Sequence, residues 1–146
     1  MVFKSRYFEE LSTKELYAIL KARSEIFVVE QNCIYQDMDG KDQESLHLFY
    51  EDEEGNVIAY LRIFKKADEE DTLQMGRVFS LRHGQGLGGM ILHKGMEALK
   101  AFPGYKSLFI EAQCYATGFY EREGFVISSE EFLEDGIPHV EMRRAI

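Results

Sequence analysis

The sequence predicts an α/β protein with a mixed, mostly antiparallel central sheet of about 6–7 strands and helices on both faces. Three patterns lead to this fold class. Runs with strand composition at 46–50, 57–64 and 72–81 follow one another through short acidic turns. Apolar residues recur at helical spacing before and after these runs. The run at 107–112 is apolar almost throughout, which is typical of a strand buried on both faces.

The predicted order of elements is β-α-loop-β-β-β-α-β-α-β-β. Ser12 and Glu15 fit a capping box that opens the first helix. The polar segment 30–40 also holds apolar residues, so we expect it to be packed. The three strands of 46–81 should form an antiparallel meander. The expected strands are 2–8, 46–50, 57–64, 72–81, 107–112, 125–127 and 139–142; the expected helices start after Ser12, start at the turn 84–89, and run over 116–123.

Composition limits the classes of function. The 146 residues are expected to form one domain, 1–146. A formal net charge of −9 argues against nucleic-acid and membrane partners, because such a surface repels phosphate groups. The sequence has neither an apolar stretch of ~18 residues nor an N-terminal signal-peptide pattern. Cys33 and Cys114 do not make a disulfide framework, and no Cys/His spacing indicates a metal site. We therefore expect a cytoplasmic protein with reduced thiols and no metal.

A glycine-rich turn, His83-Gly84-Gln85-Gly86-Leu87-Gly88-Gly89, joins a strand to a helix. Amides at a helix N-terminus lack intrahelical partners, and glycines let a phosphate approach them closely. The turn therefore indicates a pyrophosphate site. Two other interpretations stay open from the residues alone: a dinucleotide-binding fingerprint, disfavoured by its late position after a meander, and a turn that only packs its helix on the sheet. A Walker loop is excluded because Gly-Lys-Ser/Thr is missing.

Two motifs together resemble the GCN5-related N-acetyltransferase (GNAT) superfamily. The turn is similar to its Arg/Gln-x-x-Gly-x-Gly/Ala pattern, with His83 in the Arg/Gln position. The run Phe119-Tyr120-Glu121-Arg122-Glu123-Gly124-Phe125 looks like its Phe-Tyr-x-x-x-Gly-Phe. The segments 27–40 and 134–139 resemble the ElaA-type branch, so the likeness spans roughly residues 10–145. Compared with that branch, the stretch from Val78 to the glycines is about two residues shorter.

The resemblance implies the acyl-CoA N-acyltransferase fold and transfer of an acetyl group from acetyl-CoA to a primary amine by direct attack in a ternary complex. It makes Tyr120 the general acid, while Glu111, His139 and Glu30 are candidate bases. Coenzyme A is expected to contact the fourth strand, the turn and the Phe-Tyr motif. The residues are Val78, Phe79, Ser80, Leu81, His83, Gly84, Gln85, Gly86, Leu87, Gly88, Gly89, Phe119 and Tyr120.

The acceptor is expected to be a small cationic amine. By the resemblance, its cleft lies between the first helix-loop region and the C-terminal strands. Carboxylates there would attract an ammonium group, namely those of Glu30, Asp37, Asp39, Glu134 and Asp135. Arg62 and Arg77 are expected to pair with carboxylates or to line the cleft. A homodimer stays open, as do covalent catalysis through Cys114 and a non-catalytic acyl-CoA-binding module.

Overall fold

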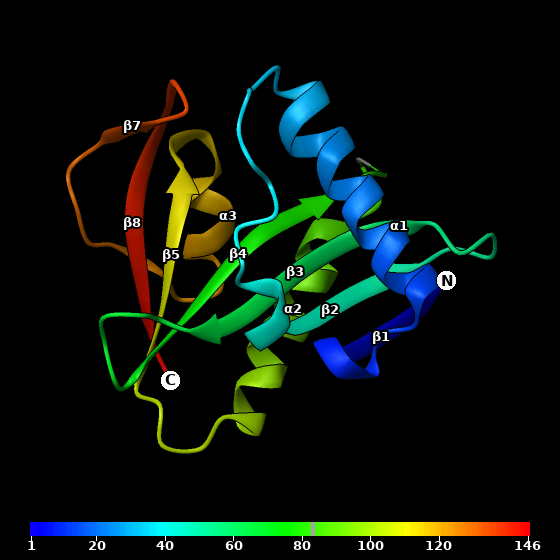
Figure 1. Ribbon diagram of the computed structural model, residues 1–146. Helices are drawn as coiled ribbons and strands as arrows, with labels where there is room; N and C mark the ends of the chain where they lie inside the picture. Colours follow the sequence, from blue (N-terminus) through cyan, green and yellow to red (C-terminus); the bar gives the residue numbers. More distant parts are fainter. Residues whose placement is uncertain (83) are drawn as a thin grey trace.

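The computed structural model describes residues 1–82 and 84–146 (Figure 1). The predicted contact of His83 with coenzyme A lies outside the described residues. Within them, eight strands form one sheet in the order β1-β2-β3-β4-β5-β8-β6, with β7 paired to β8. Paired strands are antiparallel except β4 and β5, which are parallel. The strands are β1 (Val2–Tyr7), β2 (Leu46–Glu51), β3 (Val57–Lys65), β4 (Thr72–Ser80), β5 (Ser107–Gln113), β6 (Val126–Ile127), β7 (Phe132–Glu134) and β8 (Ile137–Ala145).

Helices cover both faces of this sheet, as predicted. Helix α1 (Thr13–Arg23) lies over one face and α2 (Leu87–Ala98) over the other, while α3 (Thr117–Glu121) follows β5 (Figure 1). The predicted capping box is present, because Ser12 Oγ accepts the Glu15 amide at 3.0 Å and the Glu15 carboxylate accepts the Ser12 amide at 2.8 Å. A π-helical segment, Ser24–Glu30, extends α1. Short 3-10 turns are Phe8–Glu10, Asp42–Glu44, Leu99–Ala101 and Cys114–Ala116. No helix in the described chain is long and apolar enough to cross a membrane.

Alternation along the strands divides the core into two layers. On the α2 side, Leu61 of the sheet packs with Ile91 in one cluster of buried residues. On the α1 side, Ile19 packs with Phe49 and Phe79 in a second cluster. Side chains of successive strand residues point to opposite faces, so one sheet serves both layers. This arrangement confirms the predicted mixed sheet between helices, with one strand more than the upper expectation.

A β-bulge interrupts β4 near its centre. Tyr60 of β3 pairs with Phe79, but Arg62, two residues further along β3, pairs with Gly76 instead of Arg77. One extra residue is therefore held in β4, and Arg77 takes a left-handed backbone with φ of 54°. A bulge of this kind bends its strand and increases the local twist.

Strands β4 and β5 run side by side only over their first residues. Their parallel partners are Thr72–Gln74 and Ser107–Phe109, and the two strands diverge beyond that point (Figure 1). The divergence begins just before the bulge in β4. The edge of β4 that faces β5 is thereby left without a neighbouring strand over its second half.

The hairpin of β7 and β8 is an element that the sequence prediction missed, because it assigned only an acidic link before residue 139. Glu134 pairs with Ile137, so the loop consists of Asp135 and Gly136 alone. Both take left-handed backbones, with φ of 52° and 77°. An Asp-Gly pair is a strong signal for such a two-residue turn, and it was present in the sequence.

Candidate active site

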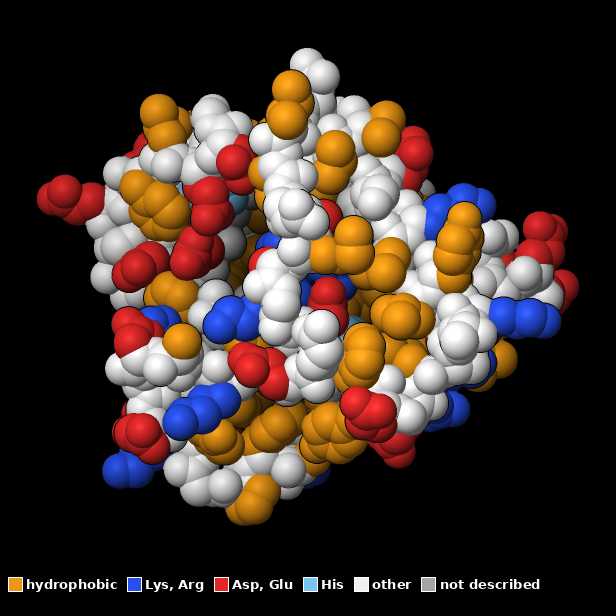
Figure 2. All heavy atoms as spheres, in the orientation of Figure 1, with side chains coloured by type: hydrophobic (Ala, Val, Ile, Leu, Met, Phe, Trp, Pro, Cys, Tyr) orange, Lys and Arg blue, Asp and Glu red, His pale blue; other side chains and the backbone are white. Residues whose placement is uncertain are grey.

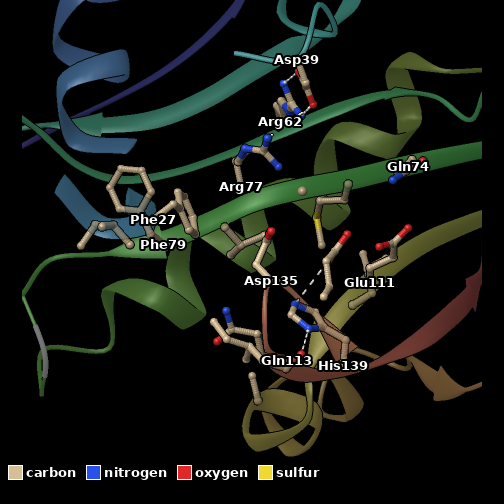
Figure 3. Close-up of a pocket in the computed structure, with 18 of the residues that line it drawn as sticks. Phe27, Asp39, Arg62, Gln74, Arg77, Phe79, Glu111, Gln113, Asp135 and His139 are labelled. Carbon is tan, nitrogen blue, oxygen red and sulfur yellow. Dashed lines mark hydrogen bonds and ion pairs between the residues drawn. The ribbon is translucent and has the colours of Figure 1, made fainter. Parts of the chain in front are cut away.

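A cleft of about 840 Å³ opens where β4 and β5 diverge (Figure 3). Its walls come from the end of the π-helix, the loop around Asp39, β3, β4, the first turn of α2, β5 with the turn and α3 after it, and the β7–β8 hairpin. Residues predicted from distant parts of the sequence meet in these walls. They are Glu30, Asp39, Val78, Phe79, Ser80, Gly88, Glu111, Phe119, Tyr120, Glu134, Asp135 and His139.

The backbone of β4 presents amides to this cleft. The Leu81 amide donates to the Ile58 carbonyl of β3 at 2.8 Å, so it is already used within the sheet. Hydrogen bonds of an antiparallel pair alternate along the strand. The amides of Ser80 and Val78 therefore point away from β3, toward the side from which β5 has diverged. Of the β4 residues expected to contact coenzyme A, Val78 and Ser80 therefore turn their amides to the opening, whereas Leu81 does not.

The glycine-rich turn leads directly into α2. Gly86 is the N-cap of the helix and has φ of 69°, and Gly84 has φ of 82°. A Cβ atom added to either glycine would meet no other heavy atom of the described residues within 4 Å. The glycines thus supply a left-handed backbone with open space around it. At Gly88, by contrast, a Cβ would lie 3.3 Å from Ser80 Oγ and 3.6 Å from the Phe119 ring, so both predicted motifs meet at this point.

Tyr120 lies in the wall of the cleft on α3. Its ring packs edge-on against Phe119 and Phe125, with ring centroids 5.1 Å and 5.7 Å away. Burial raises the pKa of the Tyr120 hydroxyl, and the neighbouring Tyr115 raises it further. Tyr120 therefore keeps its proton at neutral pH, and the raised pKa makes its hydroxyl a weaker acid than that of a free tyrosine.

Carboxylates and a histidine form the opposite wall, on β5, β7 and β8. Desolvation raises the pKa of Glu111, and the nearby Glu134 and Glu141 carboxylates raise it further, while His139 lowers it. His139 is buried, and its Nδ1 donates to the Ile137 carbonyl at 2.7 Å. Its Nε2 is then the nitrogen that faces Glu134, at 3.6 Å. Figure 3 shows Glu111 and His139 on the same side of the cleft.

A network of arginines and aspartates joins segment 31–45 to α1 and the sheet, and its members Asp39, Arg62 and Arg77 line the base of the cleft. Arg23, fully buried at the end of α1, donates to Asp42 at 2.6 Å and to Asp37 at 2.9 Å. Arg62 of β3 donates to the same Asp42 oxygen at 2.9 Å. Ion pairs thus fasten segment 31–45 to the α1 face of the sheet. The packing expected for this segment from its apolar residues is wrong for Ile34 and Met38, which are exposed.

This network changes the expectation for two of the predicted acceptor carboxylates. Arg77 donates to Asp37 at 2.9 Å, and Arg62 donates to Asp39 at 2.9 Å. Burial alone would raise the pKa of Asp39, but hydrogen bonds and attraction from Arg62 outweigh it and lower the pKa to about 2. Both aspartates are therefore paired with arginines of the sheet. Arg62 and Arg77 also line the cleft, as one of the two expectations for them had it. Glu30, Glu134 and Asp135 are exposed carboxylates at the cleft.

The sequence prediction did not single out the bulge or Gly76. Without the bulge, Arg77 would point to the same face as Leu73 and Met75, which pack on the α2 side. Instead Val78 packs against that core. The apolar positions therefore change from odd to even numbers within one strand. This change of parity is the signal in the sequence that marks the bulge.

Comparisons with known proteins agree with this geometry. The family model of the acetyltransferase (GNAT) domain matches residues 10–146. Protein ElaA of Escherichia coli is 38% identical over 143 residues, which cover 94% of this chain and 92% of ElaA. A UPF0039 protein of Schizosaccharomyces pombe is 37% identical and covers 97% of this chain and 95% of its own length.

Solved structures show the same relationship. The crystal structure of an acyl-CoA N-acyltransferase from Pseudomonas aeruginosa superimposes with a TM-score of 0.91 at 37% identity, covering 99% of this chain and 100% of that one. The crystal structure of Escherichia coli ElaA gives 0.90 at 34% identity and covers 98% of each chain. The chain therefore belongs to the GNAT family of acetyltransferases and is an acyltransferase with ElaA-type relatives.

Proposed function

We propose that this protein transfers an acetyl group from acetyl-CoA to a primary amine on a small cationic acceptor, by direct attack in a ternary complex. The observation that carries the proposal is the cleft between the diverging strands β4 and β5. Free amides of β4, a glycine-rich helix N-terminus and a protonated tyrosine all border this cleft. Members of the family use acyl-CoA as the acyl donor, and these are the groups that such a donor needs.

The glycine turn suits the pyrophosphate of coenzyme A. The N-terminus of α2 carries unpaired amides and the positive end of the helix dipole. Gly84 and Gly86 place no side-chain atom in front of them. The pantetheine arm would then follow the free edge of β4, where the Val78 and Ser80 amides have no strand to pair with. This edge leads from the turn to the cleft.

The chemistry follows from the groups around the thioester. The amine nitrogen attacks the carbonyl carbon, and the developing oxyanion is stabilised by the β4 amides that face the cleft. The C–S bond breaks, and the departing thiolate takes the proton of Tyr120. The proton lost by the amine goes to a base in the opposite wall. We assign this role to Glu111, whose raised pKa brings it closer to neutral pH, with His139 as the second candidate.

Acidic side chains support a cationic acceptor. Figure 2 shows them gathered over β5, β7 and β8, which border the cleft. Glu30, Glu134 and Asp135 line it without a guanidinium partner among the described residues. Basic side chains at the other end, Lys41 and Lys66, lie near carboxylates of their own. An ammonium group would therefore be attracted to the wall that carries the proposed base.

Binding of acetyl-CoA tests the donor site, and position 89 offers a matched pair of variants. Gly89 lies in the first turn of α2 with open space around its Cβ position. A glutamate there is favourable for the helix, because anionic side chains stabilise helix N-termini. Gly89→Glu should nevertheless weaken acetyl-CoA binding in calorimetry at least tenfold more than Gly89→Gln, because only the carboxylate repels the pyrophosphate.

Turnover tests the reaction itself. Wild-type protein is incubated with acetyl-CoA and a panel of amines, and the free thiol and the acetylated amine are measured. We expect both products in equal amounts with diamines or polyamines. Equal affinity of the two position-89 variants for acetyl-CoA would refute the donor site. Tight acetyl-CoA binding without turnover of any amine would instead favour the non-catalytic acyl-CoA-binding module.

A further inference from the structure

The bulge in β4 rests on a residue whose backbone is strained. Arg77 has φ of 54°, in the left-handed region that side chains other than glycine rarely adopt. Such a residue persists only where its surroundings hold it. Gly76, directly before it, would adopt this conformation at lower cost, yet Gly76 is outside the left-handed region. The contacts of the Arg77 side chain are therefore the place to look for what holds the bulge.

Those contacts join β4 to segment 31–45 across the base of the cleft. Arg77 Nε donates to the Asp37 carboxylate at 2.9 Å, and an Nη atom donates to the Asp37 carbonyl at 2.9 Å. The guanidinium also lies 5.6 Å from the centre of the Tyr35 ring. Figure 3 shows Arg77 pointing from β4 toward Arg62 and Asp39.

Asp37 is itself held from the opposite side. Arg23 donates to the second Asp37 carboxylate oxygen at 2.9 Å and to its carbonyl at 3.2 Å. Arg23 is fully buried at the end of α1, and Asp37 is 8% exposed. Arg77 is therefore tied to a fixed point of the fold and not to a mobile loop.

We propose that Arg77 is a positioning residue for acyl transfer: its pairing with Asp37 holds the bulge in β4 and thereby aims the amide of Val78 at the thioester carbonyl. The proposal rests on the proposed function. Val78 follows Arg77 directly, so its N–H direction is set by the Arg77 backbone. If the bulge moved or relaxed by one residue, every later side chain and amide of β4 would exchange faces. Arg77 acts through Val78 and touches no reacting atom in this scheme.

The test compares three replacements of Arg77 in the full-length protein. Arg77→Ala removes the ion pair and leaves the strained backbone. Arg77→Gly removes the ion pair and relieves the strain. Arg77→Lys keeps the charge but cannot donate from two nitrogens to the Asp37 carboxylate and carbonyl. Arg143→Ala is the matched control. Arg143 lies on β8 and makes a similar two-nitrogen pair with Glu69 of the β3–β4 connection, and neither residue lines the cleft.

Two measurements separate positioning from general loss of structure. Calorimetry compares the affinities for acetyl-CoA and for coenzyme A, which lacks the thioester carbonyl. Isotope-edited infrared spectroscopy of bound carbonyl-labelled acetyl-CoA reports the hydrogen bonding of that carbonyl. In the wild type we expect a lowered carbonyl frequency and tighter binding of acetyl-CoA than of coenzyme A. In Arg77→Ala we expect this preference to fall about tenfold and the frequency to return toward its value in water, with coenzyme A affinity changed less than about threefold.

The ranking of the variants by how much of the carbonyl frequency shift they retain is a further test. Arg77→Lys and Arg77→Gly should each keep more of the frequency shift than Arg77→Ala, and Arg143→Ala should keep all of it. If Arg77→Ala fails to fold, the lysine and glycine variants carry the same comparison. A wild type that shows the shift, with Arg77 variants that retain it fully, would overturn the positioning role alone. A wild type that does not bind acetyl-CoA would overturn the proposed function and this inference together.

Discussion

Asp42 and Arg23 form an ion pair of 2.6 Å that joins the segment before β2 to the end of α1 inside the protein. The side chain of Arg23 is fully buried and that of Asp42 is 9% exposed. The same Asp42 oxygen accepts a hydrogen bond from the buried Arg62. One carboxylate therefore bridges two buried guanidinium groups, and each of these has one further aspartate partner, Asp37 for Arg23 and Asp39 for Arg62. Removing one partner of a buried ion pair costs more stability than the intact pair contributes, because the charge of the other partner stays buried with less compensation.

We therefore expect Asp42→Asn to lower the free energy of unfolding by about 3–5 kcal/mol, measured by urea denaturation. Asp68→Asn is the control, because Asp68 pairs with Lys66 at the surface with its side chain 75% exposed. That change should stay within about 0.5 kcal/mol. A similar effect of both variants would show that the buried network does not stabilise the fold in this way.

The sequence was sufficient to predict elements whose signals are local. The capping box of Ser12 and Glu15 and the glycine turn before α2 were both placed correctly. In each case the chemistry lies within a few neighbouring residues, so the pattern is complete in the sequence. The order of strand and helix patterns likewise predicted the mixed sheet.

The base of the cleft was harder to predict because its partners are far apart along the chain. Asp37 was predicted to attract an acceptor, but Arg77, forty positions later, already neutralises it. Nothing local in the segment around Asp37 shows which arginine will face it. The only sign of the bulge in the sequence is that the apolar core positions of this strand change from odd to even residue numbers between Met75 and Val78. Pairings over such separations depend on the register of the whole sheet.

Gly76 tests whether acetyl-CoA passes beside β4 in the cleft, with a variant whose loss of activity could not be due to lost stability. Apart from its chain neighbours, a Cβ atom there would meet no atom of the described residues within 4 Å, and the backbone is not left-handed. Gly76→Ala should therefore raise the free energy of unfolding by about 0.4–1 kcal/mol, because alanine restricts the unfolded chain. The added methyl group points into the cleft instead, so kcat/KM for acetyl-CoA should fall about tenfold.

Gly95→Ala gives the opposite pattern for comparison. Its Cβ would lie 2.9 Å from a methyl carbon of Leu61 in the core, so this variant should lose stability. Urea denaturation and steady-state kinetics measure the two effects separately. A stable Gly76→Ala protein with unchanged kcat/KM would show that the donor does not pass beside β4 at this position.

Tyr120→Phe tests the general acid. The change removes one hydroxyl and keeps the ring packing with Phe119 and Phe125. We expect kcat to fall by roughly 10²–10⁴ while the affinity for acetyl-CoA is nearly unchanged. Tyr17→Phe, at an exposed position on α1, is the control. Single-turnover kinetics must accompany the measurement, since slow product release would mask a slower chemical step. A loss of less than about threefold in the chemical step would assign the proton to another group.

Glu111 should set the acidic limb of the pH profile of kcat/KM. A base must be deprotonated to act, and the pKa of Glu111 is raised, so activity should fall as the pH decreases through a value above that of an ordinary glutamate. Glu134→Gln removes a negative neighbour that raises this pKa, so the limb should move to lower pH. Glu111→Gln should abolish the limb, and Glu70→Gln, at an exposed site, should leave it in place. If His139→Gln rather than Glu111→Gln abolishes the limb, His139 is the base.

Salt dependence tests the charge of the acceptor. Glu30, Glu134 and Asp135 are exposed at the cleft, and attraction between exposed charges is screened over about 8–10 Å at 0.1–0.15 M salt. For a diamine, kcat/KM should therefore decrease as the salt concentration rises, and more steeply than for a monoamine of similar length. Asp135→Asn should flatten the dependence, because it removes one attracting charge without changing the size of the side chain. Its left-handed backbone tolerates asparagine as well as aspartate, so the β7–β8 turn should persist. A value of kcat/KM for a diamine that does not depend on salt would contradict a cationic acceptor, and so would a preference for an anionic amine. Either result would direct the search toward acceptors recognised by Lys41 and Lys66 at the other end of the cleft.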